Sequence, residues 1–224
     1  MAEAIILCGG MLEEDFILPY LAEREKKKDE PVPFVIAADR GLFFLREHAF
    51  VPDLVVGDFD SAPRGLIDRF REEHPEVEVR TYNPRKDLTD GEIAAMAALE
   101  RGYKKIVLLG CTGGRVDHLL GNLQLLARIQ EEGGSGTILD SGNRITLHQR
   151  PFSILRKEQW GNYVSFFAFG GPCEGLSLLG FRYPVRDLDL GSVGTLTVSN
   201  QIEAEEGRVS FRSGSLLMVE AADS

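Results

Sequence analysis

The stretch PDLVVGDFDS, residues 52–61, joins a short apolar run to an acidic turn. Residues 54–56 are Leu-Val-Val without polar alternation, which is typical of a strand covered on both faces of a parallel sheet. Gly57 ends the run, and the carboxylates of Asp58 and Asp60 follow it. Ligands of open α/β sheets bind beyond the carboxyl ends of the strands. The stretch therefore predicts a buried parallel strand with functional side chains at its end.

The same alternation extends to both sides of this stretch. Comparable apolar runs occur at residues 4–7, 34–38, 77–80, 106–109 and 137–139. Between the runs, residues 89–102 and 116–132 carry apolar side chains at helical spacing and stop at glycines. Strands that alternate with helices predict a mostly parallel sheet with right-handed crossovers, so residues 1–142 are expected to form one α/β domain.

The sequence pattern changes after residue 142. Short β-prone runs follow one another at residues 145–148, 163–169, 194–199, 208–211 and 216–219, with turn residues between them. No amphipathic helix pattern interrupts the series. Residues 143–224 are therefore expected to form an antiparallel β-sandwich or small barrel.

Composition narrows the class of protein. The chain has 224 residues, 43% of them hydrophobic, and a net charge of -10, which argues against a surface for nucleic acid. No apolar stretch approaches the ~20 residues that span a bilayer, so no membrane partner is expected. Three widely spaced cysteines do not suggest a disulfide framework, and a reducing cytoplasm is the expected location.

Carboxylates follow three of the predicted strands: Asp39 after the second, Asp58 and Asp60 after the third, and Asp87 and Asp90 after the fourth. Two carboxylates about 4 Å apart repel by roughly 4 kcal/mol at a near-surface dielectric, so such a cluster needs a cation. Mg²⁺ suits it because this ion prefers oxygen ligands and bridges carboxylates to phosphates. The alternative is that each aspartate only caps a helix or makes a turn.

The segment GCTGGRVDH, residues 110–118, combines a strand end, glycines and a helix start. Backbone N–H groups at Gly113 and Gly114 would face an anion there, and Arg115 adds a fork of donors for phosphate oxygens. The alternative is a tight turn in which Arg115 pairs with Asp117. Lys86 is a further candidate to neutralise phosphate charge, whereas Cys8 and Cys111 are expected to be packing residues.

Several strings together resemble the thiamine pyrophosphokinase family, also called thiamine diphosphokinases. They are AADRG at 37–41, PDLVVGDFDS at 52–61, KDLTDGE at 86–92 and GGRVDHLLGN at 113–122, followed more weakly by GFRYP at 180–184 and GTLTVSN at 194–200. The resemblance thus spans nearly the whole chain in order. It implies a Rossmann-like, mostly parallel sheet domain followed by an antiparallel β-sandwich domain, and the transfer of diphosphate from ATP to thiamine with release of AMP.

The resemblance also implies roles for individual residues. By matched position, Asp39, Asp58, Asp60, Asp87 and Asp90 would hold Mg²⁺ and the polyphosphate, with Asp58, Asp60 and Asp90 catalytic and Asp60 the preferred proton acceptor. The nucleotide would be bound by Asp39, Lys86, Gly113, Gly114, Arg115, Asp117 and His118. Thiamine would contact Tyr183, Ser199 and Asn200 in the β-domain, at the subunit interface of a homodimer. The chain departs from the family pattern at Arg40, Gly194 and Thr197.

Two other functions stay open at the level of the sequence. Related folds transfer diphosphate to hydroxymethylpterins, and only the β-domain strings favour thiamine. A non-catalytic nucleotide or thiamine sensor is a different class, which the intact carboxylate set argues against. A haloacid-dehalogenase-type phosphatase fits less well, because Asp58 and Asp60 follow the third strand and not the first.

Overall fold

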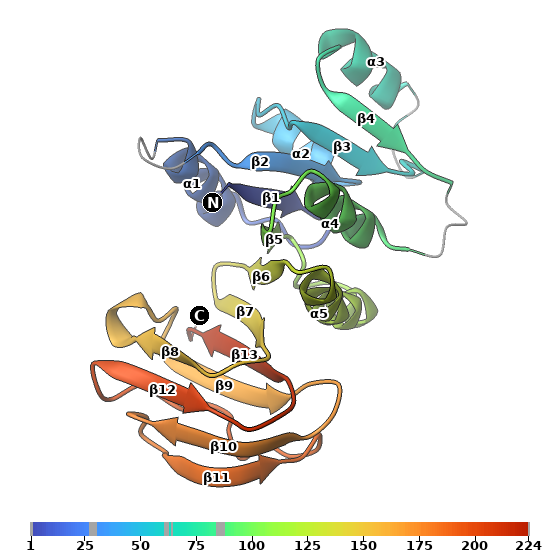
Figure 1. Cartoon of the computed structure of the whole chain (residues 1–224). Coiled ribbons are helices and arrows are strands. Elements are labelled where there is room, and N and C mark those ends of the chain that lie inside the picture. Colours follow the sequence, from blue (N-terminus) through green and yellow to red (C-terminus); the bar gives the residue numbers. More distant parts are fainter. Residues whose placement is uncertain (1, 27–30, 61–62, 64, 84–87, 224) are drawn as a thin grey trace. The chain divides into compact units, whose positions relative to one another are not determined.

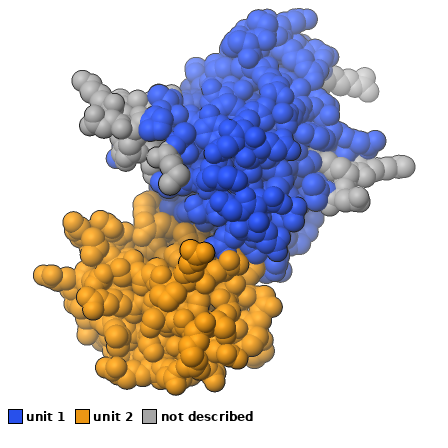
Figure 2. All heavy atoms as spheres, viewed as in Figure 1, with its two compact units in different colours: residues 1–140 blue, residues 141–224 orange. Residues whose placement is uncertain are grey.

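The structure is a computed structural model that describes residues 2–26, 31–60, 63, 65–83 and 88–223. The chain divides into two compact units, residues 1–140 and 141–224 (Figure 1, Figure 2). Among the described helices, none has both the length and the apolar character needed to cross a membrane.

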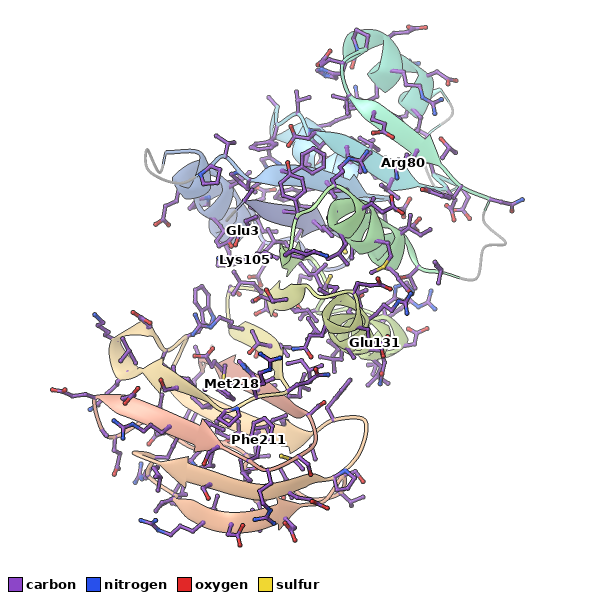
Figure 3. The ribbon with its side chains drawn as sticks, viewed as in Figure 1. Glu3, Arg80, Lys105, Glu131, Phe211 and Met218 are labelled. Atoms are coloured by element: carbon purple, nitrogen blue, oxygen red, sulfur yellow. The ribbon has the colours of Figure 1, made fainter. Side chains whose placement is uncertain are left out.

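A parallel sheet forms the centre of the first unit, with its strands in the order β4-β3-β2-β1-β5-β6. The strands are β1 (Glu3–Leu7), β2 (Phe34–Ala38), β3 (Leu54–Gly57), β4 (Glu78–Thr81), β5 (Lys105–Leu109) and β6 (Ser135–Leu139). All five residues of β1 are buried, as expected for a central strand covered on both faces. At the amino ends of β1 and β5, the cross-strand partners Glu3 and Lys105 form a 2.9 Å ion pair (Figure 3).

Helices connect these strands in alternation. They are α1 (Glu14–Lys26), α2 (Gly41–Glu47), α3 (Leu66–Glu73), α4 (Asp90–Glu100) and α5 (Val116–Glu131). The predicted helices at 89–102 and 116–132 are confirmed as α4 and α5. The Oγ1 atom of Thr89 caps α4 by accepting the Glu92 N–H at 3.2 Å. Helix α4 packs on β1, β2 and β3 and against α5, which explains why its small apolar residues are buried on most of its surface.

The second unit is a sandwich of two antiparallel sheets, in the orders β7-β13-β9 and β11-β10-β12-β8. The strands are β7 (Asn143–His148), β8 (Phe152–Leu155), β9 (Tyr163–Ala168), β10 (Cys173–Leu179), β11 (Val185–Leu190), β12 (Glu206–Ser210) and β13 (Leu216–Ala221), with a short 3₁₀ turn η1 (Arg156–Glu158). Side chains of both sheets meet in one core that includes Phe166, Leu176, Phe211 and Met218 (Figure 3). The predicted fold class is confirmed.

A fully buried carboxylate lies in the second unit. Glu220 on β13 has no exposed surface and pairs with Arg144, its cross-strand partner on β7. The N–H of Trp160 donates a further hydrogen bond of 3.1 Å to Glu220. Removal of one partner from such a pair would leave the other charge without compensation, which is strongly destabilising.

One predicted strand is wrong. Residues 196–199 form a turn in which the N–H of Val198 donates to the Thr195 carbonyl oxygen at 3.2 Å. Thr197 is buried, its carbonyl oxygen accepts the Phe166 N–H at 3.1 Å and its hydroxyl donates to the Phe166 carbonyl oxygen, so a side chain supplies one of the two bonds that a strand would make from its backbone. Ser199 has a φ of 56°, which does not fit an extended strand. The apolar residues of this stretch imitate strand alternation, but the stretch does not form a strand.

Candidate active site

The carboxyl ends of the parallel strands meet at one edge of the first unit. The N–H of Asp39, just after β2, donates to the Val56 carbonyl oxygen of β3 at 2.8 Å. On the other side of β1, the N–H of Gly10 donates to the Gly110 carbonyl oxygen after β5 at 2.9 Å. Backbone hydrogen bonds therefore hold the residue after β2 against the end of β3, and the segment after β1 against the segment after β5, as expected at the carboxyl edge of a parallel sheet.

Four of the five predicted carboxylates share one electrostatic neighbourhood at this edge. Burial raises the pKa of Asp39, and the charges of Asp90, Asp58 and Asp60 raise it further, against the opposing effect of the Arg40 N–H. The Oδ1 atom of Asp39 is buried and has no hydrogen-bond partner among the described residues. An acceptor in this state is costly unless a cation or a donor meets it.

The remaining predicted residues of this edge, Lys86 and Asp87, lie outside the described residues. Within the described part of the chain, no three His, Cys, Asp or Glu side chains gather closely enough to hold a metal ion by themselves. The donor set present is nevertheless one of carboxylate oxygens, which fits Mg²⁺. Mg²⁺ commonly takes one or two protein carboxylates and fills its other positions with water and substrate phosphates, so a complete protein cage is not required.

In the acidic turn after β3, the ring of Phe59 points away from the carboxylates of Asp58 and Asp60. The N–H of Asp60 donates to Asp58 Oδ1 at 3.1 Å, which closes the turn on itself. Phe59 has a φ of 53° and only 9% of its surface is exposed. Asp58 is half-buried and Asp60 exposed, so the turn directs the aromatic side chain inward and leaves the carboxylates at the edge.

The glycine-rich segment after β5 is shaped by left-handed residues. Gly110, Gly113 and Gly114 have φ values of 65°, 75° and 65°. The side-chain amide of Asn122 on α5 donates to the Cys111 carbonyl oxygen at 2.9 Å and so ties this segment to the helix. The buried Oγ1 atom of Thr112 has no hydrogen-bond partner within the described ranges. The segment therefore presents its backbone beside the start of α5, a geometry suited to an anion.

Arg115 and Asp117 pair with each other, as the alternative interpretation of this segment expected. Arg115 Nε lies 3.1 Å from Asp117 Oδ1 and Nη2 lies 2.5 Å from Oδ2, while the His118 N–H donates to Oδ1 at 3.0 Å. The hydrogen bond with Asp117 raises the pKa of Arg115, and the guanidinium lowers the pKa of Asp117. Both side chains are well exposed, and exposed pairs are weak, so a bound phosphate can take the place of Asp117 on the guanidinium.

A pocket next to this segment was not identified from the sequence. It lies between the start of α1 and the ends of β5 and β6, and is lined by Glu13 just before α1, by Phe16 and Ile17 on α1, and by Gly110 and Thr112 after β5. Its lining mixes apolar and acidic side chains drawn from segments more than ninety residues apart. No local pattern could have indicated it, because only the sheet brings those segments together.

The cysteines of the first unit are buried and free. A hydrogen bond with Cys8, together with burial, raises the pKa of Cys111 well above its ordinary value. Thiols that stay protonated are poor nucleophiles, which supports the expected packing role.

Two of the three residues predicted for thiamine in the second unit contact each other. Asn200 Oδ1 accepts the Tyr183 N–H at 3.0 Å, and Asn200 Nδ2 donates to the Tyr183 carbonyl oxygen at 2.9 Å. Asn200 is 2% exposed, whereas Tyr183 is 58% exposed, so Asn200 fixes the backbone from which Tyr183 projects. The N–H of Ser199 donates to Ser165 Oγ at 2.9 Å. Their predicted contact with substrate stays a prediction.

The chain is a two-unit protein, with a unit of the α/β class followed by an antiparallel sandwich. The carboxylates and the glycine-rich segment at its strand ends suit phosphate compounds. Residues 27–135 match the family model described as thiamin pyrophosphokinase, catalytic domain, and residues 152–216 match the one described as thiamin pyrophosphokinase, vitamin B1 binding domain. The chain belongs to the thiamin pyrophosphokinase family, as the resemblance predicted.

Individual relatives agree with this assignment. The thiamine pyrophosphokinase of Bacillus subtilis (strain 168) is 32% identical over 188 residues, which cover 84% of this chain and 87% of the relative. The crystal structure of thiamine pyrophosphokinase from Bacillus subtilis has a TM-score of 0.84 at 29% identity, covering 99% of this chain and 100% of that one. The crystal structure from Geobacillus thermodenitrificans has a TM-score of 0.82 at 30% identity, covering 100% and 99%.

Proposed function

We propose that this chain is a thiamine diphosphokinase, which transfers diphosphate from ATP to thiamine and releases AMP. The observation that carries the proposal is the match of one chain to both the catalytic and the vitamin B1 binding models of the family. The second match favours thiamine over a hydroxymethylpterin as the acceptor. The carboxylates gathered at the strand ends favour an enzyme over a sensor, because a binding protein has little use for charges that repel one another.

The reaction places demands that this site can meet. The hydroxyethyl oxygen of thiamine attacks the β-phosphorus of ATP, the bond to the α-phosphate oxygen breaks, and AMP leaves. Such a transfer depends mainly on positioning and on neutralising the charge of the phosphates. We assign proton acceptance from the hydroxyl to Asp60, whose exposed carboxylate lies at the edge where the substrates would meet.

Mg²⁺ would be held by Asp39, Asp58, Asp60 and Asp90, together with Asp87, and would supply charge neutralisation for the polyphosphate. Asp39 supports this assignment because its buried Oδ1 lacks a partner among the described residues, and because three neighbouring carboxylates raise its pKa. A divalent cation at this edge would remove both penalties.

The nucleotide would lie on the glycine-rich segment. Backbone N–H groups at Gly113 and Gly114, the start of α5 and the guanidinium of Arg115 are suited to phosphate oxygens. Asp117 and His118 belong to the same first turn of α5, and Lys86 is the further predicted cation. Asp117 would then release Arg115 when ATP binds.

Thiamine would contact the second unit at Tyr183, Ser199 and Asn200, in a homodimer whose active site lies between subunits. The exposed ring of Tyr183 supports this assignment, because an aromatic face attracts a cation such as the thiazolium. Arg182 already lies over that ring, with its Cζ atom 5.7 Å from the centroid, so the ring is accessible to a cation.

The deciding experiment is to incubate the purified protein with ATP, Mg²⁺ and thiamine and to measure AMP and thiamine diphosphate. Equal amounts of both products are expected. Thiamine binding without product would favour the sensor, and turnover with a hydroxymethylpterin but not thiamine would favour the other acceptor. Sedimentation of the same protein tests the dimer separately.

A further inference from the structure

The residue between the two carboxylates of the acidic turn packs into the sheet. Phe59 is 9% exposed although both of its neighbours lie at the edge. Its φ of 53° is a left-handed value that a bulky aromatic residue rarely adopts. Left-handed backbone at such a residue persists only where its surroundings hold it there. Burial of the ring is the contact that can hold it.

The ring occupies space that exists only because residue 57 is glycine. A Cβ atom at position 57 would lie 2.9 Å from Phe59 Cζ and 3.0 Å from Cε1. The same Cβ would lie 3.2 Å from the Cα atom of Asp39. The ring of Phe59 and the backbone of Asp39 therefore border one small space beside the last residue of β3.

This packing relates the carboxylates of two neighbouring strands. The hydrogen bond from the Asp60 N–H to Asp58 Oδ1 is internal to the turn and cannot fix the turn relative to the sheet. The ring supplies such an anchor, since it reaches back to Gly57 and lies beside the segment that carries Asp39. Displacement of the ring would move Asp58 and Asp60 relative to Asp39.

We propose that Phe59, seated against Gly57, is a positioning residue that sets the geometry of the carboxylates for a divalent cation. The proposal rests on the proposed function for its metal and its reaction, but its own subject is the packing of the turn. A ring that only added to the hydrophobic core would affect stability and leave cation binding unchanged. A positioning ring would affect cation binding beyond its effect on stability.

The test uses three variants of the full chain and one matched control. Phe59→Leu removes the ring, Gly57→Ala pushes the ring with a single added carbon, and the double variant combines both changes. The control is Phe70→Leu, because Phe70 is a fully buried phenylalanine of the same unit, on α3. Mn²⁺ binding is followed by electron paramagnetic resonance without substrates, and the Mg²⁺ concentration for half-maximal transfer is measured in parallel, with urea denaturation for stability.

We expect Phe59→Leu and Gly57→Ala each to weaken Mn²⁺ binding and raise the Mg²⁺ requirement by about tenfold or more, as substitutions behind metal ligands typically do. Phe70→Leu is expected to lose stability without either shift. The double variant should show less than the product of the two single effects, because the added carbon no longer meets the ring. If Phe59→Leu does not fold, Phe59→Met, which keeps more of the buried volume without the ring, decides the question by the same measurements, because the added carbon of Gly57→Ala also lies close to Asp39.

The outcomes separate this proposal from the proposed function. Unchanged Mn²⁺ binding in both single variants, or an equal shift in the Phe70→Leu control, overturns the positioning role. A wild type that binds no Mn²⁺ overturns it together with the metal assignment. A wild type that binds Mn²⁺, with the expected shifts in the variants but no transfer to thiamine, supports the positioning role and overturns only the proposed reaction.

Discussion

At the scale of single residues, the fold places the Asp39 carboxyl where its negative charge is unfavourable. Burial, Asp90 and Asp58 raise its pKa above the ordinary value of 3.8. Folding raises the pKa of this carboxyl, so the charged form is less favourable in the folded protein than in the unfolded chain. Once the pH exceeds the unfolded pKa, this difference lowers the free energy of unfolding. The stability of the metal-free protein should therefore improve when this charge is removed.

We expect Asp39→Asn to raise the melting temperature of the metal-free protein at about pH 7, by about 2–4 °C for each kcal/mol of relieved repulsion, and to lower diphosphate transfer. The gain should shrink when the pH is lowered to about 4, because protonation of the wild-type carboxyl removes the same negative charge. Thermal melts at the two pH values measure this. A variant that melts below the wild type at neutral pH would contradict the account of the cluster.

Asp60 is expected to matter for chemistry and not for folding. It is exposed, and the turn uses its backbone N–H, which asparagine retains. Asp60→Asn should lower turnover by about a hundredfold or more, the usual contribution of a proton acceptor, while the melting temperature stays close to that of the wild type. Asp68→Asn, at an exposed position of α3, is the control that should leave both unchanged. Normal turnover in Asp60→Asn would remove the assigned role.

At the scale of elements, the parallel strands were predictable from sequence and the antiparallel ones only partly. All six predicted runs of the first unit overlap observed strands. Burial on both faces leaves a continuous apolar run in the central strands, whereas the edge strand β4 is only partly buried and carries polar side chains. In the second unit, β8, β10 and β11 were missed. The pairing of β10 with β11 contains register shifts, and Gly175 inside β10 has a φ of 69°, so neither of these two strands shows clean alternation. These strands form because segments distant in the sequence pair with each other, which a local pattern does not reveal.

The candidate site also has features that the sequence predicts and features that it does not. The order of strand and helix predicts which loops lie at the carboxyl edge of the sheet, so the meeting of Asp39, Asp58 and Asp90 could be anticipated. The inward turn of Phe59 could not, because its sequence neighbours are polar and the space it fills belongs to Gly57. Two of the residues predicted for the nucleotide, Arg115 and Asp117, pair with each other in the structure, and their contact with the nucleotide stays a prediction.

Helix α5 contains a glycine that its own fold does not require. Gly121 is exposed, and a Cβ atom there would meet no atom of the described chain within 4 Å. Gly121→Ala should therefore stabilise the protein by up to about 1 kcal/mol, through helix propensity and a less flexible unfolded chain. Gly41→Ala is the contrasting variant and should destabilise, because its Cβ would lie 2.1 Å from the Leu7 carbonyl oxygen. Urea denaturation followed by circular dichroism measures both, and a destabilised Gly121→Ala protein would contradict the prediction.

At the scale of the whole molecule, two compact units need not unfold together. The chain has one tryptophan, Trp160, and it lies in the second unit beside the buried Glu220. Its fluorescence therefore reports on the second unit alone. The same unit holds His148, whose ring stacks on Phe152 with centroids 3.7 Å apart and whose Nε2 lies 2.9 Å from Thr146 Oγ1.

Burial lowers the pKa of His148 from 6.5 to about 4. Between pH 6.5 and about pH 4 the folded state binds fewer protons at this residue than the unfolded state. The contribution of neutral His148 to stability is therefore fully present above pH 6.5 and is lost as the pH falls towards 4. Between about pH 7.5 and about pH 5 the loss should reach about 2 kcal/mol. His148→Phe keeps the stacking and cannot take up a proton, so its urea transition, followed by Trp160 fluorescence, should lose less free energy over the same interval. The control variant His48→Phe, in the first unit, should lose as much free energy of unfolding in this transition as the wild type. Equal losses in the wild type and in His148→Phe would show that His148 does not set the acid sensitivity of the second unit.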